Sequence, residues 1–298
     1  MRYPLIMIIL AALTCGCADE LGPILDVPNE ELLVDTTLSL PERPVGALSG
    51  TELIAVLNPL GLREREERIL AEILTGNLPN FMRELIPISS VETIGDSTYN
   101  ITYYVTVDYM LMGSDDDYFL IPMTPILAQE LADSLNMSLI TRKMVNDIWA
   151  AAGLKLAPSP IPPSDEMVTI PVFADHNSIV RTQRMASIES YPLGTLVAGH
   201  KKDVILSNRI ETNQDKVVIY GWHQLNGQPI QSLYSGHVNW YADYSHGIRL
   251  VNSECILNGE KRNISDILSD PELYRLLSDE DGCMTMPRYP VDKSSYPG

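Results

Sequence analysis

The sequence has little positive charge and no long apolar run. Against 39 acidic residues it has only 21 lysines and arginines, so its formal charge is −18. This balance disfavours nonspecific nucleic-acid binding, which needs phosphate neutralisation, and polybasic attachment to anionic lipid. No stretch approaches the roughly 18 apolar residues of a transmembrane helix. Glycine-rich phosphate-binding loops are also missing, which argues against a nucleotide enzyme.

Cysteines are scarce as well. Only four occur, with Cys15 and Cys17 near the N-terminus and Cys255 and Cys283 near the C-terminus. Their spacing does not form a zinc knuckle. If the chain is exported, the distal pair is predicted to form a disulfide, because such bonds persist in oxidising compartments. Two free buried thiols are the alternative.

The first 17 residues have the layout of a secretory signal. Arg2 provides a positive start, an apolar run of nine covers residues 5–13, and small residues follow. Gly16-Cys17 resembles the end of a bacterial lipobox, whose cysteine is lipidated, although Thr14 and Cys15 depart from that pattern. We therefore expect an exported protein. It is either anchored in the bacterial cell envelope by a lipid on Cys17 or secreted.

The rest of the chain predicts an α+β fold, with a helical N-terminal half and a mostly β C-terminal half packed as one composite body. An acidic, proline-rich tether covers residues 18–50, and an α/β region covers residues 51–156. A proline-rich segment at 157–170 crosses to a β-rich region at 171–298, although it could instead link two domains. Helices are expected at 64–74, 79–85, 124–135, 141–152 and 264–277. Strands are expected at 99–107, 118–121, 168–173, 196–198, 204–206, 217–221 and 247–251.

All five histidines fall between His176 and His246, less than a quarter of the chain. Histidine titrates near neutral pH and is the commonest metal ligand, and a neighbouring carboxylate can orient it. Several of these histidines adjoin glycines, which permit tight turns near a ligand. The catalytic candidates are His200, Asp203, His223, His237, Asp243 and His246. The alternative is that the histidines are satisfied core or turn residues.

Candidate substrate-binding residues lie in the same window. Arg249 could hold a substrate carboxylate through two parallel hydrogen bonds. Trp222, Tyr241 and Tyr244 could stack against sugar rings. Aromatic residues used only for packing are the alternative reading.

Residues 244–250 read YSHGIRL, which resembles the SHGCIRL signature of L,D-transpeptidases, enzymes that remodel bacterial peptidoglycan. In that family an upstream strand carries a second histidine, as IYGWH, ending at His223, does here. The family's nucleophilic cysteine falls between Gly247 and Ile248, where this chain has none. The resemblance therefore implies an anionic-peptide pocket with His246 and Arg249 in matching places, but without thioester chemistry.

These features predict an exported cell-envelope hydrolase acting on peptidoglycan or another polysaccharide. Its His/Asp site would work by direct general acid–base catalysis, or through water activated by a divalent metal such as zinc. The first is favoured because no HExxH-type pair occurs. The competing hypothesis is a non-catalytic envelope lipoprotein that binds a glycan or a protein with this surface.

Overall fold

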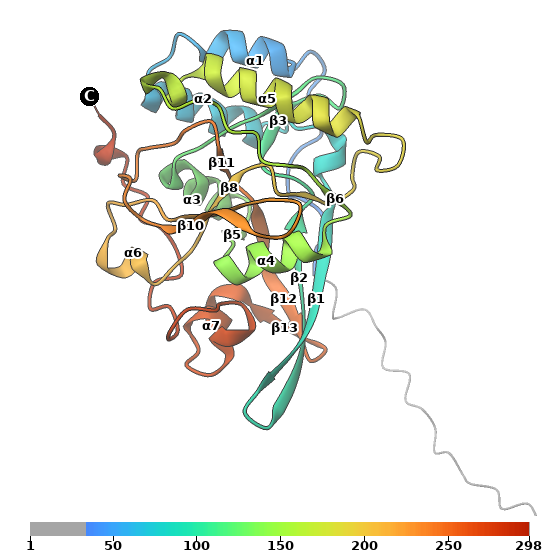
Figure 1. Cartoon of the computed structure of the whole chain (residues 1–298), viewed down its shortest axis with the longest axis vertical. Helices are drawn as coiled ribbons and strands as arrows, with labels where there is room; N and C mark the ends of the chain where they lie inside the picture. Colours follow the sequence, from blue (N-terminus) through green and yellow to red (C-terminus); the bar gives the residue numbers. More distant parts are fainter. Residues whose placement is uncertain (1–33, 298) are drawn as a thin grey trace, which may run out of the picture. The chain divides into compact units, whose positions relative to one another are not determined.

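The β-branched, aromatic stretch near residue 100 forms the longest strands of the protein. In the computed structural model, which describes residues 34–297, β1 (Leu85–Ile94) and β2 (Ser97–Thr106) pair as a regular antiparallel hairpin. β12 (Leu250–Leu257) pairs with β2, and it also holds β13 (Glu260–Asn263) and β5 (Met137–Leu139). The result is a five-stranded sheet (Figure 1).

A second sheet carries most of the candidate residues. Its order is β10 (Pro229–Tyr234), β9 (Ile219–His223), β8 (Lys202–Val204) and β11 (His246–Gly247). β8 and β11 run parallel, whereas the other pairs are antiparallel. Two short pairs complete the strands: β3 (Leu111–Gly113) with β4 (Tyr118–Leu120), and β6 (Leu154–Lys155) with β7 (Val197–Ala198). The chain is thus an α+β protein with parallel and antiparallel pairing.

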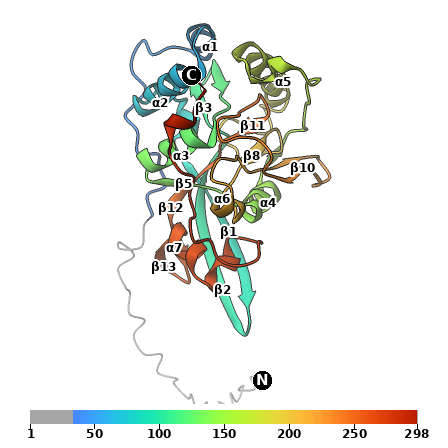
Figure 2. The ribbon, with the colours of Figure 1, turned by 90° about the vertical axis from the view of Figure 1, so that its left-hand side faces the viewer.

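Three helices lie together at one end of these sheets: α1 (Gly50–Leu57), α2 (Leu62–Leu74) and α5 (Ile170–Met185), as Figures 1 and 2 show. α3 (Pro125–Ser134) and α4 (Arg142–Ala151) pack closer to the strands, and both begin at a threonine that caps the first turn. The short helices are α6 (Arg209–Thr212) and α7 (Ile264–Ser269). The single turns are η1 (Asn80–Met82), η2 (Asp165–Val168), η3 (Leu273–Leu276) and η4 (Lys293–Ser295).

The helices predicted at 64–74, 124–135 and 141–152 are confirmed as α2, α3 and α4. The strand predicted at 168–173 is wrong, because these residues end η2 and begin α5. Pro171 lies in the first turn of α5, where its missing N–H costs nothing. The helix predicted at 264–277 stops at Ser269, just before Asp270-Pro271, and the one at 79–85 shortens to η1 before β1 begins.

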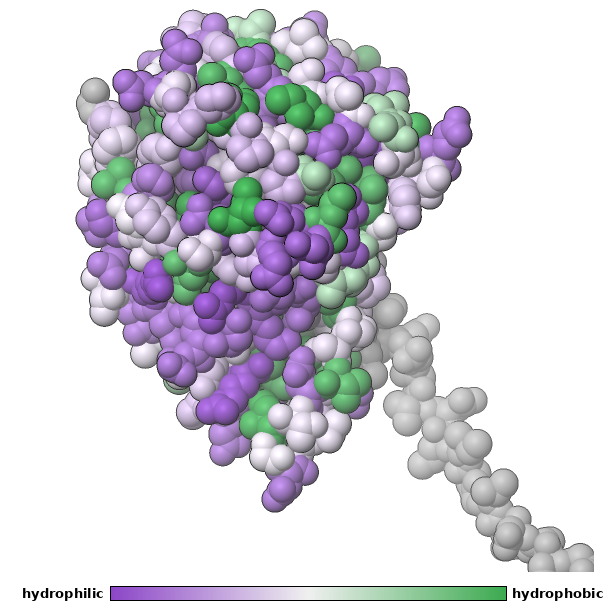
Figure 3. Space-filling view, viewed as in Figure 1, coloured by the Kyte–Doolittle hydropathy of each residue, from purple (hydrophilic) through white to green (hydrophobic). Residues whose placement is uncertain are grey.

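Some predictions fall on residues that the structure does not describe. The signal at 1–17, lipidated Cys17 and the tether up to residue 33 lie outside the described residues. Among residues 34–297, the structure contains no helix that is both long and apolar enough to cross a membrane. On the face shown in Figure 3, hydrophilic residues predominate and apolar ones are scattered, a normal pattern for a protein surface.

Candidate functional site

The second sheet divides the predicted site between its two faces. Lys202 pairs with His246, and the next residue, Asp203, pairs with Gly247. Successive side chains of a strand point to opposite faces, so Asp203 and His246 project to opposite sides of the sheet. The residues expected to form one site therefore fall into two separate clusters. The Asp203 cluster contains Asp203, His223, Tyr109 and Arg249. The Asp243 cluster contains Asp243, His246, His237 and Tyr241.

The Asp203 cluster is anchored by a buried tyrosine. Tyr109 donates its hydroxyl proton to Asp203 Oδ2 at 2.9 Å, and the guanidinium of Arg249 lies 4.5 Å from the Tyr109 ring centre. Arg249 is 1% exposed and donates from both terminal nitrogens, to the carbonyls of Thr106 and Val197, each at 2.6 Å. These bonds favour a role in holding the strands together over the predicted carboxylate clamp.

His223 joins this cluster because of a distortion in β9. Gly221 and Trp222 have φ values of +103° and +55°, in the left-handed region that a tryptophan rarely adopts. A Cβ on Gly221 would stand 3.1 Å from Asp203 Oδ2 and 3.5 Å from His223 Cε1. The glycine thus leaves the space into which the carboxyl group and the imidazole both project.

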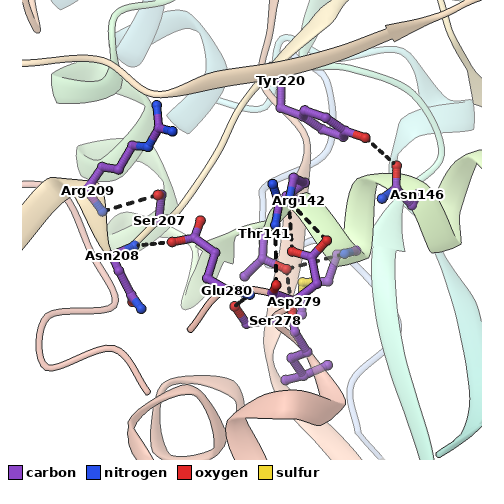
Figure 4. Close-up of polar contacts among 12 residues, drawn as sticks. Thr141, Arg142, Asn146, Ser207, Asn208, Arg209, Tyr220, Ser278, Asp279 and Glu280 are labelled. Atoms are coloured by element: carbon purple, nitrogen blue, oxygen red, sulfur yellow. Dashed lines mark hydrogen bonds and ion pairs between the residues drawn. The ribbon is translucent and has the colours of Figure 1, made fainter. Parts of the chain in front are cut away.

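A short polar chain fixes the orientation of the His223 ring. His223 Nε2 lies 3.1 Å from Asn146 Oδ1. The same Oδ1 also accepts the Tyr220 hydroxyl proton at 3.0 Å, as Figure 4 shows. With this amide orientation Nε2 carries the ring proton, so Nδ1 is the basic nitrogen. His223 Nδ1 makes no hydrogen bond within residues 34–297, and it is free to accept a proton.

A narrow pocket brings these groups to one place. Its walls include Tyr109, Trp149, Gly199, Asp203, His223 and Arg249. Trp149 stacks on His223 with ring centres 5.8 Å apart, and Lys155 Nζ lies 4.8 Å from the Trp149 ring centre. The pocket has no room for a water-sized sphere, so a substrate group can bind only if the wall moves.

Burial gives the two titratable groups of the pocket unusual proton affinities. It raises the pKa of Asp203 to about 7, although the Arg249 charge and the Tyr109 hydrogen bond oppose the shift. It lowers the pKa of His223 to about 4. Near neutral pH, the pocket therefore holds a carboxyl group that readily exchanges its proton and a neutral imidazole. The Asp203 pKa lies near the working pH and suits general acid chemistry, whereas the neutral His223 imidazole is a weak base at that pH.

The Asp243 cluster resembles a structural turn more than a reaction site. Asp243 Oδ1 accepts hydrogen bonds from the backbone N–H and the hydroxyl of Ser245, at 2.8 and 2.5 Å, and Oδ2 accepts one from Tyr241 at 3.2 Å. Burial opposes ionisation of Asp243, but His246, Lys202 and Ser245 outweigh it and lower its pKa to about 2. The carboxylate is thus charged and already satisfied.

The histidines of this second cluster contribute little chemistry. His246 is fully buried, and neither of its ring nitrogens has a hydrogen-bond partner in the part of the chain that the structure describes. Burial lowers its pKa to about 4. The half-exposed His237 stacks on Tyr241 with ring centres 4.2 Å apart. These rings pack together, and no water-exposed acid–base pair results.

The other predicted residues have packing roles. His200 Nε2 lies 3.0 Å from Asp108 Oδ1, and burial lowers the pKa of His200, so a neutral imidazole lies against the Asp108 carboxylate. Tyr244 is buried and holds the backbone of Ile161 in the proline-rich segment. Trp222 is also buried. Neither ring surface is exposed in this structure, and the expectation that Trp222 and Tyr244 stack on sugars stays a prediction.

The predicted disulfide is absent. Cys255 is buried in β12, paired in register with Tyr103 and Arg262, whereas Cys283 lies in the partly exposed C-terminal segment, and both thiols are free. Their positions in a sheet centre and in a peripheral loop explain why they do not bond. Within residues 34–297, no three His, Cys, Asp or Glu side chains gather in a geometry that could hold a metal ion.

Three residues around the Asp203 pocket and His223 escaped the sequence prediction: Tyr109, Asn146 and Trp149. They precede the histidine window by many residues, and the packing of α4 against β9 brings Trp149 to the pocket wall and Asn146 to His223. No protein-family model, curated protein or solved structure matches the chain. The likeness of residues 244–250 to the L,D-transpeptidase signature stays a prediction.

Proposed function

We propose that the protein is an exported cell-envelope hydrolase whose catalytic pair is Asp203 and His223. The observation that carries this proposal is the pocket in which the Asp203 carboxyl group and the His223 imidazole meet over Gly221. Burying a carboxyl group without a partner costs free energy of folding. Groups with strongly shifted pKa values in a pocket are therefore candidates for a functional role.

In the proposed reaction, His223 Nδ1 removes a proton from a water molecule as that water attacks the scissile bond. The protonated form of Asp203 gives its proton to the leaving group. Water is thereby added across the bond, and solvent exchange restores both residues. Tyr109 and Arg249 are positioning residues that hold the carboxyl group and the adjoining strands. Each proton-transfer partner would contribute about 10²- to 10⁴-fold to the rate.

The proposed substrate is peptidoglycan or another envelope polysaccharide. Trp149 in the pocket wall would suit a sugar ring, and Lys155, which lies over the Trp149 ring, would suit an anionic group next to it. In this proposal, the signal at 1–17 directs export, and Cys17, if lipidated, anchors the protein to the membrane.

A non-catalytic envelope lipoprotein is the second candidate. The closed state of the pocket favours it, because no water-sized space lies between Asp203 and His223. In that case, the shifted residues are a buried polar network that specifies the fold. The glycan or protein partner would bind elsewhere on the surface.

The deciding experiment incubates the protein with purified cell-wall sacculi and soluble polysaccharides and identifies products by mass spectrometry. We expect Asp203→Asn and His223→Gln each to reduce product formation at least about 100-fold. Asp215→Asn, at an exposed aspartate, should change it less than about twofold. Loss of activity in His237→Gln alone would place the chemistry in the Asp243 cluster. The absence of product with every substrate would favour the binding protein.

A further inference from the structure

A second pocket, separate from the Asp203 site, lies beside helix α2. It is mostly apolar, with a volume of about 260 Å³, and its walls include Leu62, Val168, Trp240 and Ala242. None of its lining residues belongs to the Asp203 pocket. Trp240 is 37% exposed, so the pocket is reached from solvent beside an indole ring.

The polar group in this apolar wall is the guanidinium of Arg65, whose side chain is buried and only 9% exposed. Its one hydrogen bond within residues 34–297 runs from Nη1 to the Val168 carbonyl at 3.2 Å. Nε is buried without a partner. An arginine has five N–H donors, so most of the hydrogen-bonding capacity of Arg65 is unused.

The neighbouring acid, Glu66, does not accept a hydrogen bond from Arg65 within residues 34–297. Glu66 accepts hydrogen bonds from the backbone and hydroxyl of Thr124 and from the hydroxyl of Tyr296. No ion pair joins Glu66 to Arg65 among the described residues, and burial raises the pKa of Glu66. Nη2 of Arg65 makes no hydrogen bond within residues 34–297 and is not among the buried unpaired atoms, so this terminal donor remains available to an anionic group such as a carboxylate.

We propose that this pocket binds a small organic carboxylate. The acid group pairs with Nη2 of Arg65, and an apolar body the size of one ring or a short branched chain packs against Trp240, Leu62 and Val168. A buried cation next to an apolar wall selects such a ligand over a neutral one, because a neutral ligand would leave Arg65 without its partner. The site goes beyond the proposed hydrolase and does not depend on it.

The test uses benzoate and its neutral analogue benzamide with the full-length protein at about pH 7. Binding is followed by saturation-transfer NMR and by titration of tryptophan fluorescence. We expect benzoate to bind at least about tenfold more tightly than benzamide, since one charge-assisted pair distinguishes them. Arg65→Gln should abolish this preference, and Trp240→Ala should weaken both probes.

Arg68→Gln is the matched control, because Arg68 lies on the same helix but is paired with Glu72 at the surface. It should leave both affinities unchanged. Equal binding of benzoate and benzamide, or an equal effect of Arg68→Gln, would overturn the proposal. If Arg65→Gln fails to fold, the proposal is tested by two other results: tighter binding of benzoate than of benzamide to the unchanged protein, and weaker binding of both probes to Trp240→Ala.

Discussion

Asp203 is a buried carboxyl group whose protonation should couple folding to pH. Its pKa rises from 3.8 to about 7 on burial, so the folded state holds the proton more tightly than the unfolded state. The stability that follows is fully present below about pH 4 and is lost as pH rises through 7. Asparagine resembles the protonated carboxyl group and does not ionise.

We therefore predict that Asp203→Asn gains stability relative to the native protein as pH increases from about 5 to about 8. The gain should approach about 3 kcal/mol, at roughly 1.4 kcal/mol per pH unit within the window. Urea unfolding at several pH values measures it, and Asp215→Asn shows the effect of removing a surface carboxylate. A stability difference that does not change with pH would mean that Asp203 is already charged in the folded protein.

The two C-terminal cysteines should differ in reactivity. The thiolate is the reactive form, and burial raises the pKa of Cys255 to about 12. Iodoacetamide should therefore modify half-buried Cys283 in the native protein and Cys255 only after unfolding. Peptide mapping by mass spectrometry distinguishes the two. If neither reacts in denaturant without reductant, a disulfide joins them and the assignment of free thiols fails.

At the residue scale, the sequence predicted the site residues that lie close together in the chain as well as in the fold. The histidine window contains both Asp203 and His223, because β8 and β9 are close in the chain. Tyr109 and Asn146 come from distant elements and carry no local signal. Sequence spacing also could not reveal that Asp203 and His246 face opposite sides, because that depends on the register between β8 and β11.

At the element scale, β9 depends on Gly221. Alanine there would meet both the strain of φ +103° and crowding against Asp203 Oδ2 and Val145, at 3.1 and 3.3 Å. We predict that Gly221→Ala destabilises the protein by about 2–6 kcal/mol, with strain and overpacking each contributing about 1–3 kcal/mol.

Gly259→Ala separates these two causes. Gly259 has φ +84° in the turn between β12 and β13, but nothing lies within 4 Å of its added Cβ. Gly259→Ala should therefore lower the free energy of unfolding only by the cost of backbone strain, about 1 kcal/mol. Urea denaturation of both variants provides the comparison. Equal losses would show that Gly221 is required for its backbone conformation and not for the space between Asp203 and His223.

The elements predicted correctly have strong local signals. α3 and α4 start at capping threonines, and α2 repeats its apolar residues at helical spacing. The segment at 168–173 misled the prediction because its β-branched residues favour a strand in isolation. Burial of Ile170 and Phe173 on one face of α5 overrides that preference.

At the scale of the whole molecule, the C-terminal segment connects distant elements. Asp279 pairs with Arg142 at the start of α4, and Glu280 accepts from the Asn208 backbone (Figure 4). Further along, the Tyr289 hydroxyl donates to the Ile205 carbonyl at 2.7 Å and accepts from the Val218 N–H at 3.0 Å. Residues 34–297 cluster as one compact unit, so these contacts should be lost together on unfolding.

We predict that Tyr289→Phe destabilises the whole unit by about 2 kcal/mol, because it leaves a buried carbonyl and a buried N–H without their partner. Asp279→Asn should cost less than about 1 kcal/mol, since its ion pair with Arg142 is partly exposed. Calorimetry and tryptophan fluorescence should report the same midpoint for each variant, lowered most in Tyr289→Phe. Two separate transitions, with only one of them shifted, would show that the C-terminal segment stabilises its immediate neighbours and not the body as a whole.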